Sequence, residues 1–382
     1  MISYGRQSIS LEDIEAVTKV LSSDFLTQGP QVPHFEREVA EYCGAEHACA
    51  VNSATSALHI ACLSLGLGPG DWLWTTPITF VSSANCALYC GAKVDFVDID
   101  PDTCNLSIER LEEKLVHAKR NGCLPKILVP VHLAGQSCDM RAISELAQQY
   151  KFYVIEDAAH AVGGRYLKDP VGSCRFSDIA VFSFHPVKII TTGEGGMALT
   201  NNPQLSEKMH LLRSHGITRN PEKMTHVPDG EWYYQQIALG FNYRMTDIQA
   251  ALGRSQLKRV DEFVARRQQL AARYNRLLEK LPVVLIKQYP DALSSFHLYV
   301  IRVNQKSHMS VFSFLREAGI GVNLHYIPVH TQPYYRQRGF HNITFPIAES
   351  YYREAVSLPI YPELDEQQQD IVVSALGEAL AK

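Results

Sequence analysis

The stretch FSFHPVKIITTGEGGMALT, residues 182–200, holds two short apolar runs separated by a loop with one lysine, Lys188. IAVFSF (179–184) and GMALTN (196–201) each have the length and composition of a buried strand. We therefore expect two neighbouring strands of a core sheet, with Lys188 in the glycine-containing loop between them.

The region before this stretch repeats one pattern, in which a β-rich run is followed by a segment of helical period. Five such runs precede it: ACAVN (48–52), WLWTTP (72–77), KVDFVDI (93–99), KILVPVHL (126–133) and FYVIED (152–157). Repeated strand-then-helix order is typical of a mainly parallel sheet covered on both faces. The sequence thus predicts an α/β fold, whose ligands bind beyond the carboxyl ends of the strands.

Composition narrows the class of protein. The chain has 382 residues, 46% of them hydrophobic and 20% charged, and a net charge of −4, which fits a soluble globular protein and gives no basic footprint for nucleic acid. We see no signal peptide and no apolar run long enough for a membrane span. The nine cysteines form no C-x-x-C pair, so we expect reduced thiols, no metal site and a cytoplasmic location.

The pattern of the last third of the chain predicts a separate domain. A pattern without proline from Thr246 to Leu281 predicts one long helix. Two further β-rich runs, FHLYVIRV and GVNLHYI (321–327), alternate with helical segments, so we expect a small α/β domain with His325 on one of its strands. We place a large domain at 1–245, and the linking helix with the small domain at 246–382.

Lys188 and Asp157 form the first candidate pair. A lysine forms an imine with an aldehyde only as the neutral amine, and burial lowers its pKa toward neutrality. Asp157 ends the run YVIED, where a carboxylate faces the binding crevice and can pair with a pyridinium nitrogen. The alternatives are a surface lysine and a helix-capping aspartate.

Small hydroxyl residues after the first strand suggest a phosphate site. In NSATSALHIA (52–61) a helix begins near Thr55, so free N–H groups and the helix dipole point to the crevice, with Ser53 and Ser56 adding hydroxyls. The same letters also make an ordinary N-cap. Ser183, before the lysine loop, is a further candidate for the phosphate.

Two other residues fit a flat aromatic ligand. Phe80, at a strand-to-helix turn, can stack on a ring, although core packing is the commoner role of phenylalanine. His160 can donate to a ring oxygen, although a lone histidine is more often structural. GLGPGDWLW (66–74) follows a helix and precedes a strand, the reverse of a dinucleotide loop, which disfavours an oxidoreductase.

These motifs together resemble a known family. EDAAHA, SFHPVK, TTGEGGM, NSATSALH and GFNYRMTDIQAALG, in this order, are similar to the DegT-type nucleotide-sugar aminotransferases. The resemblance covers nearly the whole chain. It implies the aspartate-aminotransferase fold (fold type I), with a seven-stranded, mainly parallel sheet in the large domain and a smaller C-terminal α/β domain.

The resemblance also implies roles for residues and a cofactor. Lys188 would hold pyridoxal 5′-phosphate as a Schiff base and then move the proton during catalysis, while Asp157 holds the pyridine nitrogen, His160 contacts the ring hydroxyl and Phe80 stacks on the ring. The phosphate would be bound by Thr55, Ser56, Ser183 and, from a second subunit, Asn242. We therefore expect a homodimer with shared active sites.

Within the family, YGRQSI, DFLTQGP, NSATSALH and RSHGITR most resemble 4-aminotransferases of pseudaminic acid biosynthesis. This similarity implies that UDP-2-acetamido-2,6-dideoxy-β-L-arabino-hexos-4-ulose accepts the amino group of L-glutamate, with Tyr4, Thr27 and His325 as candidate substrate contacts. A UDP-linked 4-keto-pentose and GDP-4-keto-6-deoxymannose are alternative acceptors. A pyridoxal-phosphate-binding regulator without turnover is the alternative from another class, disfavoured because no DNA-binding appendage is visible.

Overall fold

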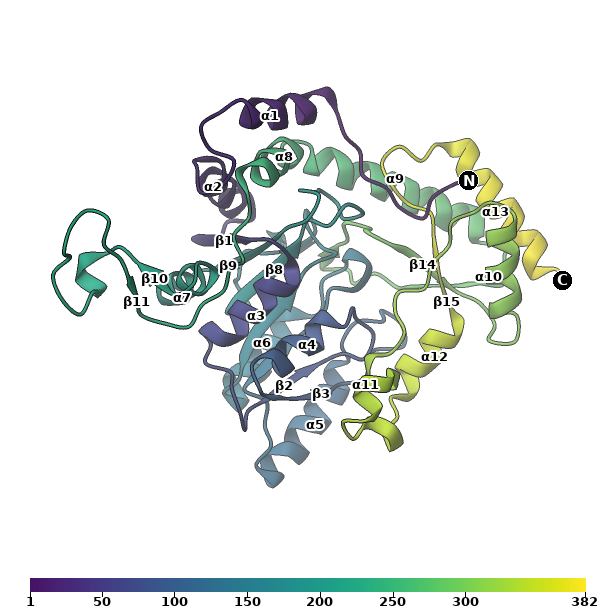
Figure 1. The fold of residues 1–382 in the computed structure, drawn as a ribbon. Coiled ribbons are helices and arrows are strands. Elements are labelled where there is room, and N and C mark those ends of the chain that lie inside the picture. The colour runs from purple at the N-terminus through teal and green to yellow at the C-terminus, as the bar shows by residue number, and fades with distance from the viewer.

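The computed structural model describes the whole chain, residues 1–382, and has a seven-stranded sheet at its centre (Figure 1). The strand order is β1-β9-β8-β5-β4-β2-β3. From β8 to β3 the neighbours pair in parallel, and β9 is antiparallel to both β1 and β8. The bounds are β1 (His47–Val51), β2 (Trp72–Thr75), β3 (Lys93–Phe96), β4 (Ile127–Val129), β5 (Tyr153–Asp157), β8 (Ile179–Ser183) and β9 (Gly196–Thr200). The predicted mainly parallel sheet of seven strands is confirmed.

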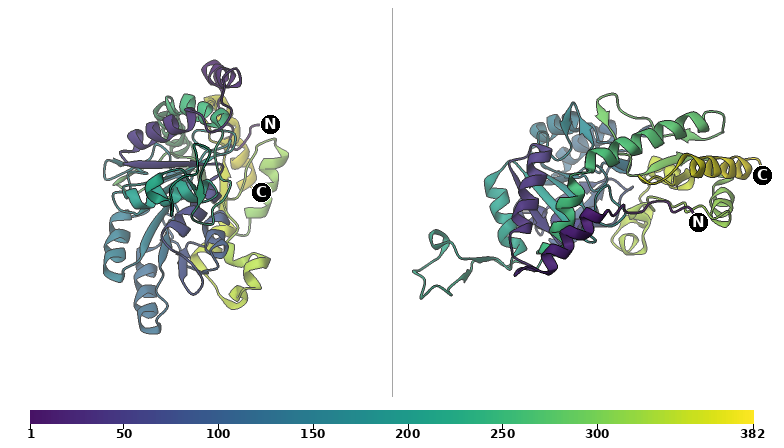
Figure 2. Two further views of the ribbon diagram at one scale, coloured as in Figure 1. Left: turned by 60° about the vertical axis from the view of Figure 1, so that its left-hand side comes forward. Right: turned by 90° about the horizontal axis from the view of Figure 1, so that it is seen from above.

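Helices pack on both faces of this sheet (Figure 2). One face packs against α3, α4 and α7, and the other against α2 near β1 and against α5 and α6 near β4. The bounds are α1 (Leu11–Leu21), α2 (Gln31–Cys43), α3 (Ala54–Ser64), α4 (Ser82–Tyr89), α5 (Ile108–Asn121), α6 (Met140–Tyr150) and α7 (Pro203–Arg213). Because both faces are covered, the strands are apolar at nearly every position.

The segment predicted as one long helix is two helices, α8 (Asp247–Leu257) and α9 (Val260–Leu278). The prediction of a single helix was wrong because a tertiary contact interrupts it. Arg259 leaves helical geometry, with φ −110° and ψ 7°, and its Nη2 donates to Asp13 Oδ2 at 2.6 Å. The break lets α8 pack against α1 while α9 runs on toward the C-terminal part.

The C-terminal part contains a second, antiparallel sheet in the order β12-β14-β15. The bounds are β12 (Val284–Leu285), β14 (Tyr299–Arg302), β15 (Ala355–Leu358), α10 (His308–Glu317), α11 (Pro333–Arg336), α12 (Pro346–Glu354) and α13 (Glu366–Leu380). Residues 321–327 are not a strand, so the expectation for His325 was wrong. The backbone of this segment pairs with β15 at a single isolated bridge, between Asn323 and Ser357, and forms no longer ladder.

The two predicted domains pack against each other. Ile2 pairs with Ile320, and its carbonyl accepts a hydrogen bond from Gly321 N–H at 2.6 Å, so the N-terminus lies beside the C-terminal part (Figure 2). The largest apolar cluster joins residues of the seven-stranded sheet to Leu298 and Tyr351. The boundary at residue 245 stays a prediction.

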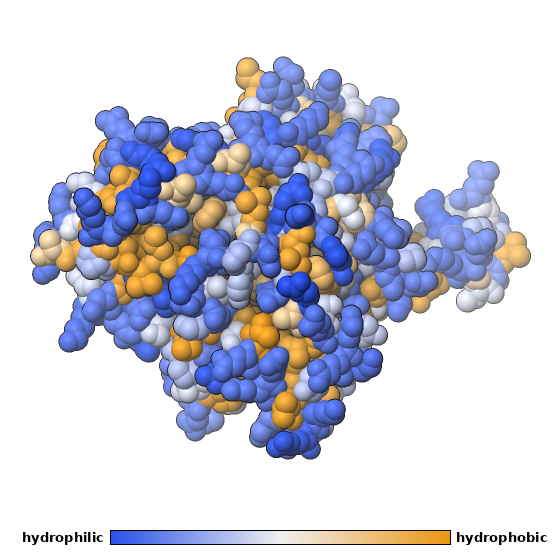
Figure 3. Space-filling view, turned by 180° about the vertical axis from the view of Figure 1, so that it is seen from behind, coloured by the Kyte–Doolittle hydropathy of each residue, from blue (hydrophilic) through white to orange (hydrophobic).

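An arm, residues 219–239, projects from the body of the molecule (Figures 1 and 3). It begins after β10 (Ile217–Thr218) and contains the short strand β11 (Gln235–Gln236). Large apolar side chains on it are open to solvent, with Val227 83% and Trp232 74% exposed. The remaining short strands, β6 (Arg165–Tyr166), β7 (Asp169–Pro170) and β13 (Ala292–Leu293), form a separate small sheet. None of the helices combines the length and the apolar character needed to cross a bilayer.

Candidate active site

A cavity of about 480 Å³ lies beyond the carboxyl ends of β5 and β8, at the place expected for a ligand of such a sheet. It is lined by most of the residues that the sequence singled out, namely Tyr4, Thr55, Phe80, Asp157, His160, Ser183, Lys188 and His325. Segments far apart in the sequence therefore meet here. The roles of these residues remain proposals.

Three predicted residues lie outside the cavity lining. The hydroxyl of Ser56, in the first turn of α3, donates to Asn52 Oδ1 at 2.6 Å, just before that helix. Thr27 pairs with Thr246 in an isolated bridge. Asn242 is exposed and pairs with Ser214 at the base of the arm. The expected role of Asn242 in a second subunit stays a prediction.

The amine of Lys188 is the only lysine group on the cavity wall. The turn before it is closed by its own N–H, which donates to His185 O at 2.9 Å. Burial lowers the pKa of Lys188 to about 8, against an opposing attraction from the Asp157 carboxylate. A substantial fraction of this amine is therefore neutral near physiological pH, as a nucleophile requires.

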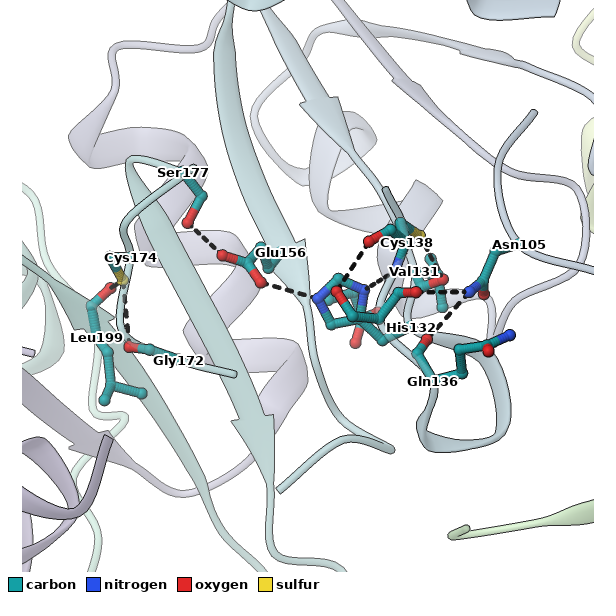
Figure 4. Close-up of polar contacts among 12 residues, drawn as sticks. Asn105, Val131, His132, Gln136, Cys138, Glu156, Gly172, Cys174, Ser177 and Leu199 are labelled. Atoms are coloured by element: carbon teal, nitrogen blue, oxygen red, sulfur yellow. Dashed lines mark hydrogen bonds and ion pairs between the residues drawn. The ribbon is translucent and has the colours of Figure 1, made fainter. Parts of the chain in front are cut away.

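Asp157 is fixed by two donors. Ser83 donates its hydroxyl to Oδ2 at 2.5 Å, and Ala159 N–H donates to Oδ1 at 3.2 Å. The preceding residue, Glu156, points to the other face of the sheet, because successive strand residues alternate. There it contacts His132 Nε2 at 2.8 Å and accepts from Ser177 Oγ at 2.5 Å (Figure 4). The run YVIED thus gives one carboxylate to the cavity and one to a buried network.

The N-terminus of α3 forms another part of the wall. Ser53 caps this helix, accepting a hydrogen bond from Ser56 N–H at 3.1 Å. Ala54 and Thr55 line the cavity, and the first N–H groups of a helix have no acceptor within it. Gly196 approaches so closely that a Cβ there would lie 2.5 Å from Ala54 N. The arrangement is suited to an anion such as a phosphate.

His160 and Tyr326 form a directed pair. Ala134 N–H donates to His160 Nδ1 at 3.3 Å, which places the ring proton on Nε2, and Nε2 lies 2.9 Å from the Tyr326 hydroxyl. Burial, and after it the nearby basic groups of Lys188 and His325, hold the pKa of His160 well below its usual value. Neutral His160 therefore donates to Tyr326, whose own O–H is left to donate to a ligand.

The other walls are aromatic and polar. The ring of Phe80, 56% exposed, lies 6.2 Å from that of Tyr326 across the mouth. His325 contacts Ser357 Oγ through Nδ1 at 2.9 Å, and its ring lies 5.5 Å from that of Tyr4. Burial lowers the pKa of His325 to about 4, so this residue is a neutral contact.

The sequence interpretation missed several lining or supporting residues, above all Ser83, His297 and Tyr326. Ser83 stands three residues after Phe80, in a turn that the sequence already placed at the cavity, so its role was within reach. His297 and Tyr326 come from the C-terminal part, and nothing in their local sequence tells that they face Lys188.

Residues 7–377 match the model of the DegT/DnrJ/EryC1/StrS aminotransferase family. The chain belongs to this family. A UDP-4-amino-4,6-dideoxy-N-acetyl-beta-L-altrosamine transaminase of Campylobacter jejuni is 40% identical over 388 residues, which cover 100% of this chain and 98% of the relative. The resemblance stated from the sequence is thereby confirmed, including its closeness to the pseudaminic acid enzymes.

Solved structures agree with this assignment. Helicobacter pylori PseC, an aminotransferase involved in the biosynthesis of pseudoaminic acid, has a TM-score of 0.91 and 32% identity, covering 100% of this chain and 99% of that one. The PLP-form of the putative sugar aminotransferase Spr1654 from Streptococcus pneumoniae has a TM-score of 0.90 and 27% identity, covering 100% and 98%. The fold and the membership in a family of sugar aminotransferases are therefore established.

The charge state of Lys188 gives a testable pH dependence. We expect the acylation rate of Lys188 in the apo-protein, measured by competitive labelling and mass spectrometry, to rise with a midpoint near pH 8. Exposed lysines, with pKa values of about 10.4, serve as internal reference. Asp157→Asn should lower the midpoint further, since this carboxylate stabilises the ammonium form. A midpoint for Lys188 equal to that of the exposed lysines would contradict the account.

Proposed function

We propose that this chain binds pyridoxal 5′-phosphate and transfers the amino group of L-glutamate to the keto carbon of a nucleotide-linked 4-keto-6-deoxy sugar. One observation carries the proposal: a lysine amine, whose pKa burial lowers to about 8, shares one cavity with a strand-end carboxylate and a helix N-terminus. A cytoplasmic location stays a prediction.

The donor set of the cavity fits this cofactor. An aldehyde requires a neutral amine, which Lys188 provides; a protonated pyridine nitrogen requires a carboxylate, which Asp157 provides. A phosphate requires N–H groups and hydroxyls, and the start of α3 with Thr55 and Ser183 provides them. Phe80 offers a ring face for stacking. Ser56 stays a prediction as a phosphate ligand, because its hydroxyl is engaged with Asn52.

When bound, pyridoxal 5′-phosphate supplies a carbonyl that takes up the amino group and a ring that delocalises the electron pair left at the reacting carbon. The protein residues do the rest. Lys188 takes the proton from one carbon and returns it to another, for which a pKa near working pH is best suited. The Asp157 carboxyl group would bind the ring nitrogen, and Ser83 holds that group in place by a hydrogen bond.

We extend the proposal to a homodimer with shared sites. Asn242 is exposed and lies outside the cavity of its own chain. The arm that precedes it carries exposed apolar side chains, among them Leu239 at 81%. Exposed apolar surface of this kind marks an interaction site. Both features are accounted for if the arm packs on a second copy and Asn242 reaches the phosphate there.

For the acceptor we propose UDP-2-acetamido-2,6-dideoxy-β-L-arabino-hexos-4-ulose. The support is the name of the Campylobacter relative, together with the 40% identity over the full chain. A UDP-linked 4-keto-pentose and GDP-4-keto-6-deoxymannose remain the alternative acceptors. The amino sugar formed from each acceptor has a different mass, so mass spectrometry of the products distinguishes the three substrates.

The half-reaction with the amino donor tests the proposal. Protein loaded with pyridoxal 5′-phosphate should be yellow, lose its colour when glutamate is added, release 2-oxoglutarate, and convert the UDP-linked keto sugar to its amine. Lys188→Ala should reduce turnover by at least about a thousandfold, because the proton then has no carrier. Lys19→Ala, at an exposed position on α1, is the matched control.

Two outcomes would contradict the proposal. Colourless protein that rejects added cofactor would exclude the aldehyde-binding role of Lys188. A yellow protein that responds to no amino donor would favour the regulator without turnover.

Mixed dimers test the shared site. Lys188→Ala and Asn242→Ala should each have little activity alone. In an equal mixture after subunit exchange, about a quarter of all sites regain both residues, since half of the dimers are mixed and each has one intact site. Recovery to about that level, measured as sugar amination, is expected. No recovery despite exchange verified by native mass spectrometry would show that Asn242 acts within its own chain.

A further inference from the structure

His297 is a fixed residue of the cavity wall, and the proposed function described above gives it no role. It precedes β14 and is 4% exposed. The Nη1 group of Arg267 donates to the carbonyls of Phe296 and His297, at 3.2 and 3.3 Å, and fixes the backbone. The His297 ring lies 4.4 Å from the His160 ring, measured between centroids. The side chain is therefore held in one position beside the reactive centre.

The ring nitrogens of His297 are not satisfied within the protein. Nδ1 is sealed from solvent and has no hydrogen-bond partner, so Nε2 is the nitrogen that a ligand in the cavity can reach. A buried N–H without an acceptor is rarer than a buried lone pair without a donor, which places the proton on Nε2. His160 and His325, in contrast, use both of their nitrogens.

His297 is a neutral donor. Its pKa is held well below the usual value, first by burial and then by unfavourable interaction of a charged His297 ring with the basic groups around it, among them Lys188 and Arg267. No carboxylate contacts its ring to reverse this effect. At neutral pH the ring therefore presents one N–H to the cavity and carries no charge.

The hydrogen-bond donors around Lys188 favour an anionic ligand. The N–H of His297, the free O–H of Tyr326 and the Lys188 amine all face the same space, and no arginine of this chain lines it. A carboxylate on the carbon whose proton Lys188 moves must lie within a few ångströms of that amine. Hydrogen bonds to an ionised acceptor are about twice as strong as neutral ones, so a carboxylate gains more here than a sugar hydroxyl does.

We propose that His297, through Nε2–H, binds the α-carboxylate of the amino donor. The inference rests on the proposed function and names a binding residue for its first substrate. It assigns recognition of the donor to an uncharged side chain from the C-terminal part, in the cavity that Tyr326 also lines. The sugar then enters the same space in the second half-reaction without leaving a buried cation unpaired.

A pair of substitutions tests this subsite. The amide nitrogen of His297→Gln reaches the place of Nε2, whereas that of His297→Asn, one carbon shorter, does not. Glutarate, a dicarboxylate that cannot react, is the probe, and its Kd for the holoenzyme is measured by calorimetry. We expect His297→Asn to raise this Kd and the KM for glutamate about tenfold, and His297→Gln to raise them no more than about threefold. The KM for the sugar should stay within about twofold in both.

The controls separate this inference from the proposed function. His308→Gln, on α10 and outside the cavity, should bind glutarate like the unaltered protein. If the unaltered holoenzyme neither bleaches with glutamate nor binds glutarate, the proposed function fails. If it does both and His297→Asn binds glutarate equally well, only the role of His297 is overturned. If the substitutions raise only the KM for the sugar, His297 binds the acceptor, and its proposed role in binding the donor is likewise overturned.

Discussion

The Lys188 amine is held where two forces oppose each other. Burial favours its neutral form, and the Asp157 carboxylate in the same cavity favours its charged form. The balance leaves a pKa of about 8, which allows the side chain both to attack a carbonyl and to move a proton near neutral pH. The neighbouring histidines stay neutral in the presence of this cation, so the rest of the cavity contributes hydrogen bonds rather than further charge.

This balance is a product of sheet geometry. Asp157 and Ser183 end two adjacent parallel strands on the face that carries α3, while Glu156 points to the opposite face and contacts His132 within a buried network. The lysine loop follows β8 directly, and the close approach of Gly196 to α3 brings the helix N-terminus to the same edge. One edge of one sheet thus carries the residues proposed to bind three groups of the cofactor: a carbonyl, a ring nitrogen and a phosphate.

The sequence predicted those features of the fold and the site that depend on residues close together in the chain. The strand runs, the turn at Ser53 and the strand-end position of Asp157 follow from periodicity and capping, and the order of the motifs identified the family. Tertiary contacts determine the rest: Arg259 interrupts the long helix and contacts Asp13, and the segment around His325 pairs with β15 only at one isolated bridge. The part played by His297 depends on an unpaired nitrogen, which only the folded chain reveals.

The covalent attachment point is the most direct test of this account. The purified protein, loaded with pyridoxal 5′-phosphate and reduced with borohydride, is digested and its peptides are mapped by mass spectrometry. The account predicts one pyridoxyl group per chain, on Lys188, and its loss when glutamate is added before the reduction. An adduct on a different lysine, or none at all, would contradict it.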